Sequence, residues 1–366
     1  MDALMLPLNW QKVRLGDILS YEQPTKYLVA TTQYLQKGFT PILTAGKTFI
    51  LGYTNDKHGI YTNIPVIIFD DFTTDSKMVN FPFKVKSSAI KILSLRDNNQ
   101  ADLKYIYEKL TLLKHQVTDH KRYWIDEFSN FEIPLPPLNE QSTIANILSD
   151  LDRYLCALDA LILKKEGVKK ALSFELLSQR KRLKGFNQAW QRVRLGDICE
   201  IVKGQQINKI SLNNTDKYPV INGGIDFLGY TNKFNVSKNT IAISEGGTCG
   251  YVRFMTSNFW SGGHNYSLQK ISNKVNNLCL YHILKSYEKD IMKLGVGSGL
   301  KNIQLKALKN FEIPLPPLNE QSAIANILSG LDNEIASLKN KKRQFENIKK
   351  ALNHDLMSAK IRVLKK

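Results

Sequence analysis

A chain of 366 residues has room for two domains and their connectors, and its 43% apolar content excludes a disordered basic tail. The formal net charge of +18 (51 Lys and Arg, 33 Asp and Glu) predicts an anionic partner, with nucleic acid ahead of a membrane surface. The four cysteines include no CxxC pair, and the sequence contains neither a signal peptide nor a run of transmembrane length. We therefore expect a protein of the reducing cytoplasm that contacts no membrane.

The first predicted domain, residues 1–138, opens on WQKVRLGDI at 10–18. Short apolar runs such as PVIIF at 65–69 alternate with Gly, Asn and Asp turns, which is typical of strands. A helix is expected near 101–114. The domain is therefore predicted to be mainly β.

A long helix is predicted within residues 139–186. Asn139 follows a proline-rich segment and can accept a hydrogen bond from the first free amides, while Glu140 suits the positive end of the helix dipole. We expect the helix to run to about Arg182, before Gly185 ends the segment. Apolar residues recur at alternating steps of four and three and predict a heptad seam: Ile144, Leu148, Leu151, Leu155, Leu158 and Ile162.

The rest of the chain repeats this plan at a constant offset in residue number. WQRVRLGDI at 190–198 opens a second strand-rich domain, residues 187–318, and a second helix is predicted within 319–366. The segment FEIPLPPLNEQSTIANILSDLD at 131–152 returns at 311–332 with 20 of 22 residues unchanged, which indicates duplication of a whole module. The second seam contains Ile324, Leu328, Leu331, Ile335, Leu338 and Phe345.

The two narrow apolar stripes predict that the helices pair. A helix of ~40 residues would be ~60 Å long, and the simplest pairing of two duplicated modules is pseudo-twofold, which makes the helices antiparallel. The predicted fold class is therefore α+β: two mixed, mainly β recognition domains separated by two long antiparallel helices that form a coiled coil. The alternative is that each helix packs only on its own domain.

The two domains diverge between the repeated segments. Residues 1–138 carry 16 − 14 = +2 charges, whereas residues 187–318 carry 16 − 8 = +8. A constant frame with a variable interior is expected if two modules present different recognition surfaces.

Base edges and phosphates are contacted by Arg, Lys, Asn, Gln and small hydroxyl side chains. In the first domain the candidate DNA contacts are Lys47, Thr54, Asn55, Lys57, Lys84, Lys86, Lys121 and Arg122. In the second domain they are Asn222, Tyr230, Asn232, Lys233, Arg253, Asn265, Lys301 and Asn302. The motif LGYTN occurs in both halves, so a turn is an equal alternative for its residues. Glu245, in a glycine-rich loop, could accept a hydrogen bond from cytosine.

No catalytic, cofactor or metal motif is complete. Gly46-Lys47-Thr48 lacks the earlier glycine of a phosphate loop, because position 41 is Pro41. A metal-dependent nuclease built on Asp70, Asp71 and Asp75 is one alternative function, although an acidic loop after a strand explains the same residues. A protein-binding scaffold that never touches DNA is another. We expect no catalytic residue, no metal and no cofactor.

The doubled FxIPLPPLNEQ segment with its heptad helix, and the doubled WxxVxLGDI, resemble the specificity subunit of type I restriction-modification enzymes over essentially the whole chain. The resemblance implies two target-recognition domains that each read half of a split site in double-stranded DNA. It also implies that the helices set the spacer and bind two methyltransferase subunits, that the complex recruits restriction subunits, and that this chain does no chemistry.

Overall fold

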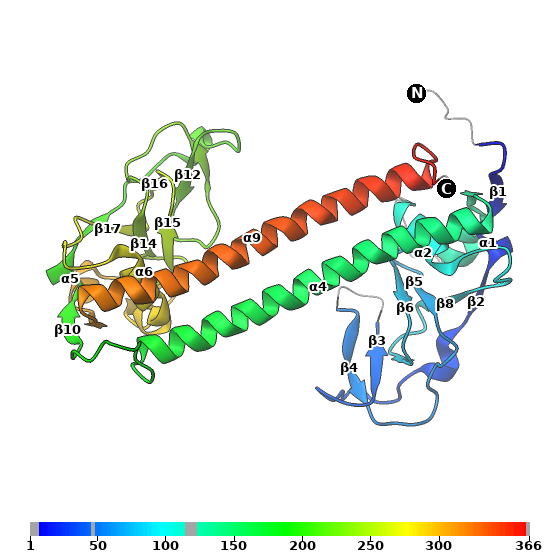
Figure 1. The fold of residues 1–366 in the computed structure, drawn as a ribbon, viewed down its shortest axis with the longest axis horizontal. Coiled ribbons are helices and arrows are strands. Elements are labelled where there is room, and N and C mark those ends of the chain that lie inside the picture. The colour runs from blue at the N-terminus through cyan, green and yellow to red at the C-terminus, as the bar shows by residue number, and fades with distance from the viewer. Residues whose placement is uncertain (1–6, 45–47, 114–122, 364–366) are drawn as a thin grey trace. The chain divides into compact units, whose positions relative to one another are not determined.

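The computed structural model describes residues 7–44, 48–113 and 123–363 (Figure 1). Its contacts form two compact units: unit 1 comprises Met1–Asp159 and Lys341–Lys366, and unit 2 comprises Ala160–Asn340. Each unit contains one mixed α/β domain and one part of each long helix.

The described residues of unit 1 form three small sheets. The central sheet has the strand order β2-β8-β5-β6 and is antiparallel throughout. Every residue of β5 is buried, which explains why this strand reads as a continuous apolar run. The strands are β1 (Gln11–Arg14), β2 (Leu19–Glu22), β3 (Thr40–Leu43), β4 (Ile50–Thr54), β5 (Val66–Asp70), β6 (Ser76–Val79), β7 (Lys84–Val85), β8 (Ile90–Leu95) and β9 (Glu132–Leu135).

The other two sheets of unit 1 are β4-β3-β7, in which β3 and β7 are parallel, and the antiparallel pair β1-β9. The pair β1-β9 joins the opening WQKVRLGDI segment to the proline segment, because Val13 lies opposite Ile133. The helices of this domain are α1 (Leu15–Ile18), η1 (Pro24–Tyr27), α2 (Leu103–Leu112), α3 (Tyr123–Asp126) and η2 (Phe128–Asn130).

Unit 2 repeats this topology. The sheets β11-β17-β14-β15, β13-β12-β16 and β10-β20 match those of unit 1 in order and direction, and a short pair β18-β19 is added. The strands are β10 (Gln191–Arg194), β11 (Glu200–Lys203), β12 (Tyr218–Ile221), β13 (Gly229–Thr231), β14 (Thr240–Ser244), β15 (Val252–Met255), β16 (Trp260–Ser261), β17 (Asn265–Gln269), β18 (Gly295–Val296), β19 (Asn302–Ile303) and β20 (Glu312–Leu315).

The helices of this second domain also follow the plan of the first. They are α5 (Leu195–Ile198), η3 (Lys209–Ser211), α6 (Asn277–Ser286), α7 (Glu288–Met292) and α8 (Leu305–Lys309). Helix α6 and helix α2 even share their capping chemistry, since the Asn276 side chain accepts from the amide of Cys279 and the Asp102 side chain accepts from the amide of Tyr105.

The two predicted long helices are α4 (Leu138–Leu177) and α9 (Leu318–Met357). Helix α4 begins at Leu138, one residue before the predicted capping residue Asn139, whose side chain accepts from the amide of the next residue, Glu140, at 2.9 Å. Helix α4 ends at Leu177 rather than near Arg182, because Gln179 adopts a left-handed conformation with φ of 62°. No helix in the described ranges is both long and apolar enough to cross a membrane.

The first turns of each long helix pack into a domain core. Ile144 and Leu148 of α4 join Leu356 and Met357 of α9 in the core of unit 1. Ile324 and Leu328 occupy the corresponding place in the core of unit 2. The remaining residues of the predicted seams are buried or half-buried: Leu151, Leu155, Leu158, Ile162, Leu331, Ile335, Leu338 and Phe345.

Within each unit the parts of α4 and α9 run antiparallel. In unit 1, Asp152 pairs with Lys349 and Asp159 pairs with Lys342, so the numbering rises along one helix as it falls along the other. The rings of Tyr154 and Phe345 lie 4.6 Å apart between these pairs. In unit 2, Lys165 pairs with Glu334 at 2.8 Å, and Lys169 pairs with Asp332.

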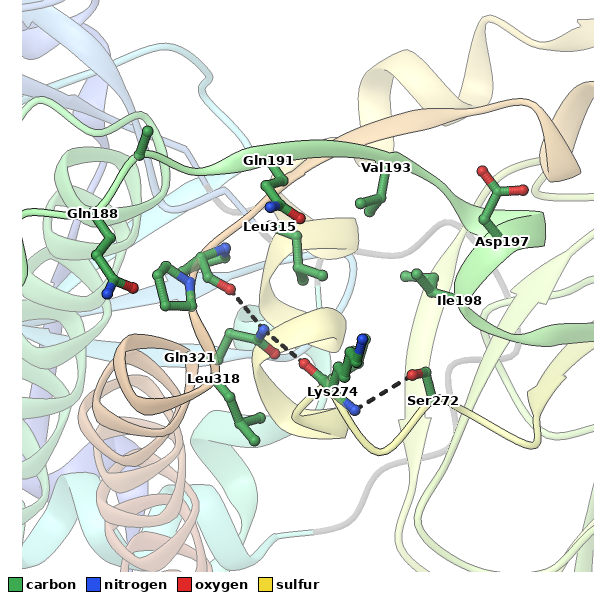
Figure 2. Close-up of a pocket in the computed structure, with 14 residues that line it drawn as sticks. Gln188, Gln191, Val193, Asp197, Ile198, Ser272, Lys274, Leu315, Leu318 and Gln321 are labelled. Atoms are coloured by element: carbon green, nitrogen blue, oxygen red, sulfur yellow. Dashed lines mark hydrogen bonds between the residues drawn. The ribbon is translucent and has the colours of Figure 1, made fainter.

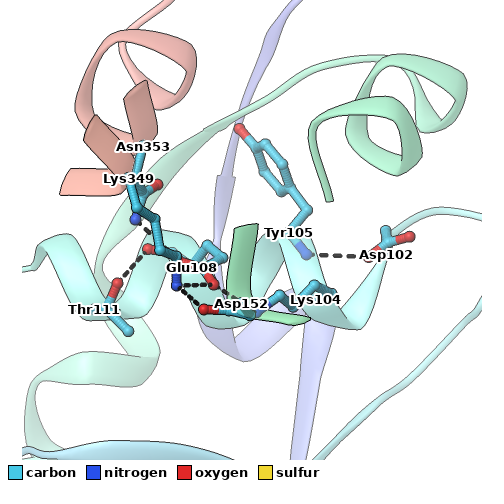
Figure 3. A network of polar contacts seen from close by, with 8 residues as sticks. All are labelled: Asp102, Lys104, Tyr105, Glu108, Thr111, Asp152, Lys349 and Asn353. Atoms are coloured by element: carbon cyan, nitrogen blue, oxygen red, sulfur yellow. Dashed lines mark hydrogen bonds and ion pairs between the residues drawn. The ribbon is translucent and has the colours of Figure 1, made fainter. Parts of the chain in front are cut away.

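A polar network around the buried Glu108 joins α2 to both long helices in unit 1 (Figure 3). Glu108 is 1% exposed and accepts hydrogen bonds from Lys104, Lys349 and Asn353 at 2.5, 3.2 and 3.0 Å. Burial alone would raise the pKa of the Asp152 carboxyl, but hydrogen bonds from Lys104 and Lys349 outweigh it and hold that pKa below its usual value. The network therefore keeps the Asp152 carboxylate charged at neutral pH.

Unit 2 keeps the matching ion pair between Lys169 and Asp332, but a neutral His282-Ser329 pair takes the place of the contacts of Glu108. His282 occupies the position on α6 that Glu108 occupies on α2, six residues after the capping residue in each case. Its Nε2 lies 3.0 Å from the hydroxyl of Ser329, and burial lowers the pKa of this histidine to about 4. The repeated backbone plan thus carries different polar chemistry in the two units.

Candidate nucleic-acid interface

Loops from four parts of unit 2 meet at one edge of its sheets, which we call the glycine edge: Lys203–Gln206, Asn222–Gly224, Glu245–Gly247 and Ser261–His264, together with Asn302. Backbone hydrogen bonds hold the loops together. The amide of Gln205 donates to Ser261 at 2.8 Å, that of Glu245 donates to His264 at 3.0 Å, and that of Ile303 donates to Glu245 at 2.9 Å.

Two glycines let polar side chains lie flat on this edge. A Cβ at Gly263 would lie 2.5 Å from Nε2 of Gln206, so the glutamine side chain covers the bare backbone there. A Cβ at Gly246 would collide with Oδ1 of Asn302. A larger residue at either glycine would therefore displace the amide that lies against it.

Glu245 organises the charges of the glycine edge. Its Oε1 accepts from Lys203 Nζ at 2.7 Å and from the Tyr266 hydroxyl at 3.2 Å, and its Oε2 lies 3.8 Å from His264 Nδ1. Burial, with the neighbouring Glu245 carboxylate second, raises the pKa of Tyr266 to about 12, so the phenol remains a donor. Because Lys203 and Tyr266 already occupy Oε1 of Glu245, cytosine reading by this carboxylate gains no support.

Most of the predicted DNA contacts of unit 2 are at least partly exposed and lie in two places. Asn222 and Asn302 lie on the glycine edge, and the exposed Lys301 directly precedes Asn302. Asn222 uses its Oδ1 to accept from the amide of His264 at 2.9 Å. Asn232 and Lys233 are exposed beyond β13, and Tyr230 is half-buried within it.

Two predicted contacts of unit 2 hold the structure together instead. Asn265 is 2% exposed and donates to the Ser261 hydroxyl and to the Tyr266 carbonyl at 3.0 and 3.1 Å. Arg253 donates to the carbonyls of Gly224 and Ile225 at 2.7 and 2.5 Å, and burial lowers its pKa. Asn265 could contact DNA only by giving up these bonds, and Arg253 already binds two carbonyls through one terminal nitrogen, so we leave both out of the interface.

The predicted contacts of unit 1 are more dispersed. Lys57 and Lys86 are exposed, whereas Thr54 and Asn55 accept from the backbone amides of Asp56 and Phe39, which supports the turn interpretation of LGYTN. Lys47, Lys121 and Arg122 lie outside the described residues.

The surroundings of Lys84 argue against the predicted DNA contact of this residue. It is 4% exposed, and its Nζ lies 2.6 Å from Oδ2 of Asp56 and 2.7 Å from the carbonyl of His58. The hydrogen bond from Lys84, followed by one from the backbone of His58, lowers the pKa of Asp56. A phosphate could reach this lysine only after the ion pair had opened, so we leave Lys84 out of the interface.

The acidic residues behind the nuclease alternative have structural partners. Asp70 accepts from the amide of Phe72 and from the Thr73 hydroxyl, at 2.9 and 2.6 Å. Asp71 lies 3.0 Å from Lys91, and both side chains are buried. No group of three His, Cys, Asp or Glu in the described ranges is placed to hold a metal. These contacts support the acidic-loop interpretation.

Both units carry the same junction between domain and long helix. In unit 2, Gln321 donates to the carbonyls of Pro316 and Lys274 at 2.7 and 3.1 Å and accepts from the amide of Asn276 at 2.7 Å. In unit 1, Gln141 makes the matching bonds to Pro136, Gln100 and Asp102 at 2.8, 3.1 and 2.9 Å. One glutamine therefore fixes the proline segment to the domain in each half.

A groove of ≈ 580 Å³ opens beside the unit 2 junction (Figure 2). Figure 2 shows Gln321 among the side chains that line it, with Leu318 nearby. Most of its lining recurs in the first half of the sequence at the offset that relates the two FEIPLPPLNEQ segments. The recurring residues are Gln191, Val193, Asp197, Ile198, Leu315, Pro316, Pro317, Leu318 and Gln321.

A second contact that occurs in both units joins the segment after one long helix to the first turn of the other long helix. In unit 2, Arg182 donates two hydrogen bonds of 2.8 Å to the carboxylate of Glu320, which also accepts from the indole of Trp190 at 2.9 Å. In unit 1, Arg362 and Trp10 make the corresponding bonds to Glu140.

Sequence reasoning missed several residues of these surfaces. Lys203, Gln206 and His264 of the glycine edge were not among the candidates, although the Gly-Gly pairs at 223–224, 246–247 and 262–263 mark the loops that meet there. The two arginines of the repeated contact, Arg182 and Arg362, are separated by the same offset as the repeated segments and could have been found from it.

Comparison with known proteins agrees with the resemblance found in the sequence. The family described as "Type I restriction modification DNA specificity domain" matches residues 7–165 and again residues 187–347. The chain is 34% identical over 356 residues to the specificity subunit of the Escherichia coli type I restriction enzyme EcoR124I/EcoR124II, covering 87% of this chain and 85% of that protein. It is 26% identical to the MjaVIII specificity subunit of Methanocaldococcus jannaschii, over 99% of this chain and 95% of that one.

A solved structure shares the fold. The type I restriction-modification S subunit from M. genitalium superimposes with a TM-score of 0.76 and 22% identity, over 96% of this chain and 97% of that one. The predicted fold class, with mixed domains and two long helices, is thereby confirmed. Because the family matches both halves and the Escherichia coli relative is 34% identical over most of both chains, this chain belongs to the type I restriction-modification DNA specificity subunits.

Proposed function

We propose that each unit reads one half of a bipartite site in double-stranded DNA and that the chain does no chemistry itself. The observation that carries this proposal is that each unit combines residues that recur in the other unit with residues that do not. The junction glutamine, the Trp-Glu-Arg contact and the paired helices recur, whereas the residues around the glycine edge of unit 2 do not recur in unit 1. A constant frame suits a partner that binds twice, and variable loops suit two different half-sites.

We assign partner binding to the junctions between domain and long helix, which recur in both units. We place one methyltransferase subunit on each junction, at the groove beside Gln321 and at its counterpart beside Gln141, and restriction subunits would join through that complex. The repetition of the groove lining supports a partner present in two copies. The four cysteines are free thiols, in keeping with a cytoplasmic setting.

Methylation mapping tests the DNA-reading role. The chain would be expressed with its methyltransferase in a host that lacks DNA methylation, and modified bases would be mapped across the genome. We expect one bipartite motif that vanishes when this gene is omitted. Methylation without sequence preference, or methylation that persists without the gene, would contradict the proposal.

Substitution in the groove tests the docking assignment. Leu318 is 44% exposed and lines the groove, so Leu318→Glu should reduce recovery of methyltransferase in a pull-down. Ile210→Glu is the matched control, because Ile210 is 91% exposed and does not line the groove. Equal recovery with both variants would place the methyltransferase elsewhere.

The continuous helices are proposed to set the unread spacer between half-sites. The segments 1–138 and 187–318 would be the reading domains, and 139–186 and 319–366 the spacer segments. Each helix spans 40 residues, and the contacts of unit 1 give way to those of unit 2 between Asp159 and Ala160 in α4 and between Asn340 and Lys341 in α9.

Inserting one heptad at both of these points leaves every helix contact within a unit in place. It should add ~10 Å of helix, or about three base pairs, to the spacer and leave both half-site sequences unchanged. Insertion in one helix alone shifts the register of the pair and should abolish methylation. A mapped motif with its original spacer after the double insertion would refute the idea.

A further inference from the structure

We propose that Gln206 and Asn302 are specificity-determining residues of unit 2 and that each reads an adenine in its half-site. This inference rests on the proposed DNA-reading function. Carboxamides pair with adenine through two bonds, because the amide nitrogen donates to N7 while the oxygen accepts from the N6 amino group. Such reading needs a carboxamide that is exposed, oriented and free of bonds within the protein.

Three asparagines around the glycine edge fail this requirement. Asn265 is buried and doubly bonded, and Asn222 accepts from the amide of His264. Asn235 bonds the backbone of Ser261 through both of its amide atoms, at 3.0 and 2.7 Å. These side chains fix the loops and have little capacity left for a base.

Gln206 and Asn302 differ from them in both respects. Both are exposed, and within the described ranges neither side chain makes a hydrogen bond to the protein. Each rests on a glycine, since Cβ positions built on Gly263 and Gly246 would meet the Gln206 and Asn302 amides respectively. The atoms nearest these glycines are Nε2 of Gln206 and Oδ1 of Asn302, so backbone contact positions each amide although no hydrogen bond within the protein fixes it.

The surroundings of these two amides suit DNA. His264 belongs to the same edge, because it follows Gly263 and its Nδ1 is 3.8 Å from the Cβ position of Gly246. The exposed Lys301 directly precedes Asn302 and supplies a cation for a phosphate, whereas Lys203, 54% exposed at its side chain, is already paired with Glu245. Base-reading amides and a backbone-contacting cation are therefore present together.

Substitution at Gln206 gives a sharp test, because the replacement can predict a new base. In the mapped motif, Gln206→Ala should relax one adenine position of one half-site, with discrimination falling about tenfold to hundredfold. Gln206→Glu should favour cytosine at that position, because a carboxylate accepts from the cytosine amino group. Asn302→Ala should relax a different position of the same half-site.

Two further variants separate reading from folding. Gly263→Ala displaces the Gln206 amide and should weaken the same position as Gln206→Ala while the other half-site stays unchanged. Gln304→Ala is the control, because Gln304 is an exposed carboxamide two residues after Asn302 that makes no capping bond on α8. It should leave the motif intact.

The outcomes distinguish this inference from the proposed function. A wild-type chain that directs methylation to a bipartite motif, with Gln206→Ala and Asn302→Ala directing it to the identical motif, would overturn only the inference. Relaxation at a guanine, cytosine or thymine position would overturn the adenine assignment. Loss of the bipartite motif in the wild type would overturn the proposed function itself.

Discussion

Arg362 donates two hydrogen bonds to Glu140, from Nε to Oε1 at 2.8 Å and from a terminal nitrogen to Oε2 at 3.0 Å, across 222 residues of sequence. The indole of Trp10 donates to the same carboxylate at 3.2 Å, so the segment after α9 is fixed to the first turn of α4 and to the strand that opens the domain. Glu140 is 7% exposed. Bidentate charge-assisted bonds of this kind orient two groups as well as attracting them.

Removing the charge of Glu140 should weaken unit 1. Glu140→Gln keeps the side-chain shape but leaves a single neutral acceptor, because the new amide nitrogen cannot accept from Arg362, and we expect the thermal unfolding midpoint to fall by about 2–4 °C. Calorimetry of the full chain measures this. Glu320→Gln is the matched variant in unit 2 and should have a similar effect. An unchanged midpoint in both variants would mean that the contact contributes nothing to stability.

Truncating Lys349 should cost more than truncating its neighbour. Its Nζ lies 2.6 Å from Asp152 and 3.2 Å from the buried Glu108, so Lys349→Ala leaves a buried carboxylate with one cation fewer. We expect a loss of about 2 kcal/mol in the free energy of unfolding, reduced from the value for a fully buried pair because Lys349 is partly exposed. Lys350→Ala removes an exposed lysine and should change it by under about 0.5 kcal/mol. Equal losses in denaturant titrations would argue against the network.

The buried His282 predicts a pH dependence of stability. Its pKa is about 4 in the folded protein and 6.5 for the free side chain, so the unfolded chain binds a proton that the folded chain excludes between these values. The free energy of unfolding therefore has its full value with respect to this group above pH 6.5. It decreases by roughly 1.4 kcal/mol per pH unit as the pH falls from 6.5 to about 4. His282→Gln should flatten the curve in that window, whereas His354→Gln, at an exposed position, should not. Parallel curves for His282→Gln and wild type would exclude the assignment.

The four thiols should react at different rates. Cys156 is exposed, whereas burial raises the pKa of both Cys199 and Cys279 to about 12 and also raises that of Cys249. Because the thiolate is the reactive form, an aromatic disulfide reagent should titrate one fast thiol in the native protein. Cys156→Ser should abolish that fast phase, and Cys279→Ser should preserve it. A fast phase that survives Cys156→Ser would contradict this order of exposure.

The elements that the sequence predicted correctly depend on local physics. The heptad steps from Ile144 to Ile162 predict a long helix with one apolar side, because 3.6 residues per turn bring such positions onto one face. The short apolar run PVIIF at 65–69 predicts a strand because of its composition, and strand β5 (Val66–Asp70) is found there. The end of α4 was misjudged because the left-handed turn at Gln179 has no glycine or proline to mark it.

The candidate interface depended on contacts that no local pattern contains. Lys84 and Arg253 resemble DNA-contacting residues in the sequence, yet Asp56 neutralises one and two carbonyls bind the other, across 28 or more residues. Gln206 was missed because the glycine that its amide lies against, Gly263, is far away in sequence and adjacent in the fold.

By itself the sequence determined that this protein is one module used twice, with a constant frame and a divergent interior, because repetition and periodicity are properties of the chain order. The tertiary structure alone decided which polar side chains of the divergent interior remain free, because a hydrogen bond between distant loops depends on where the fold places its donors and acceptors. The structure thereby points to the amides of Gln206 and Asn302, which lie against glycines, as base-reading groups, whereas the sequence alone had pointed to Lys84 and Arg253.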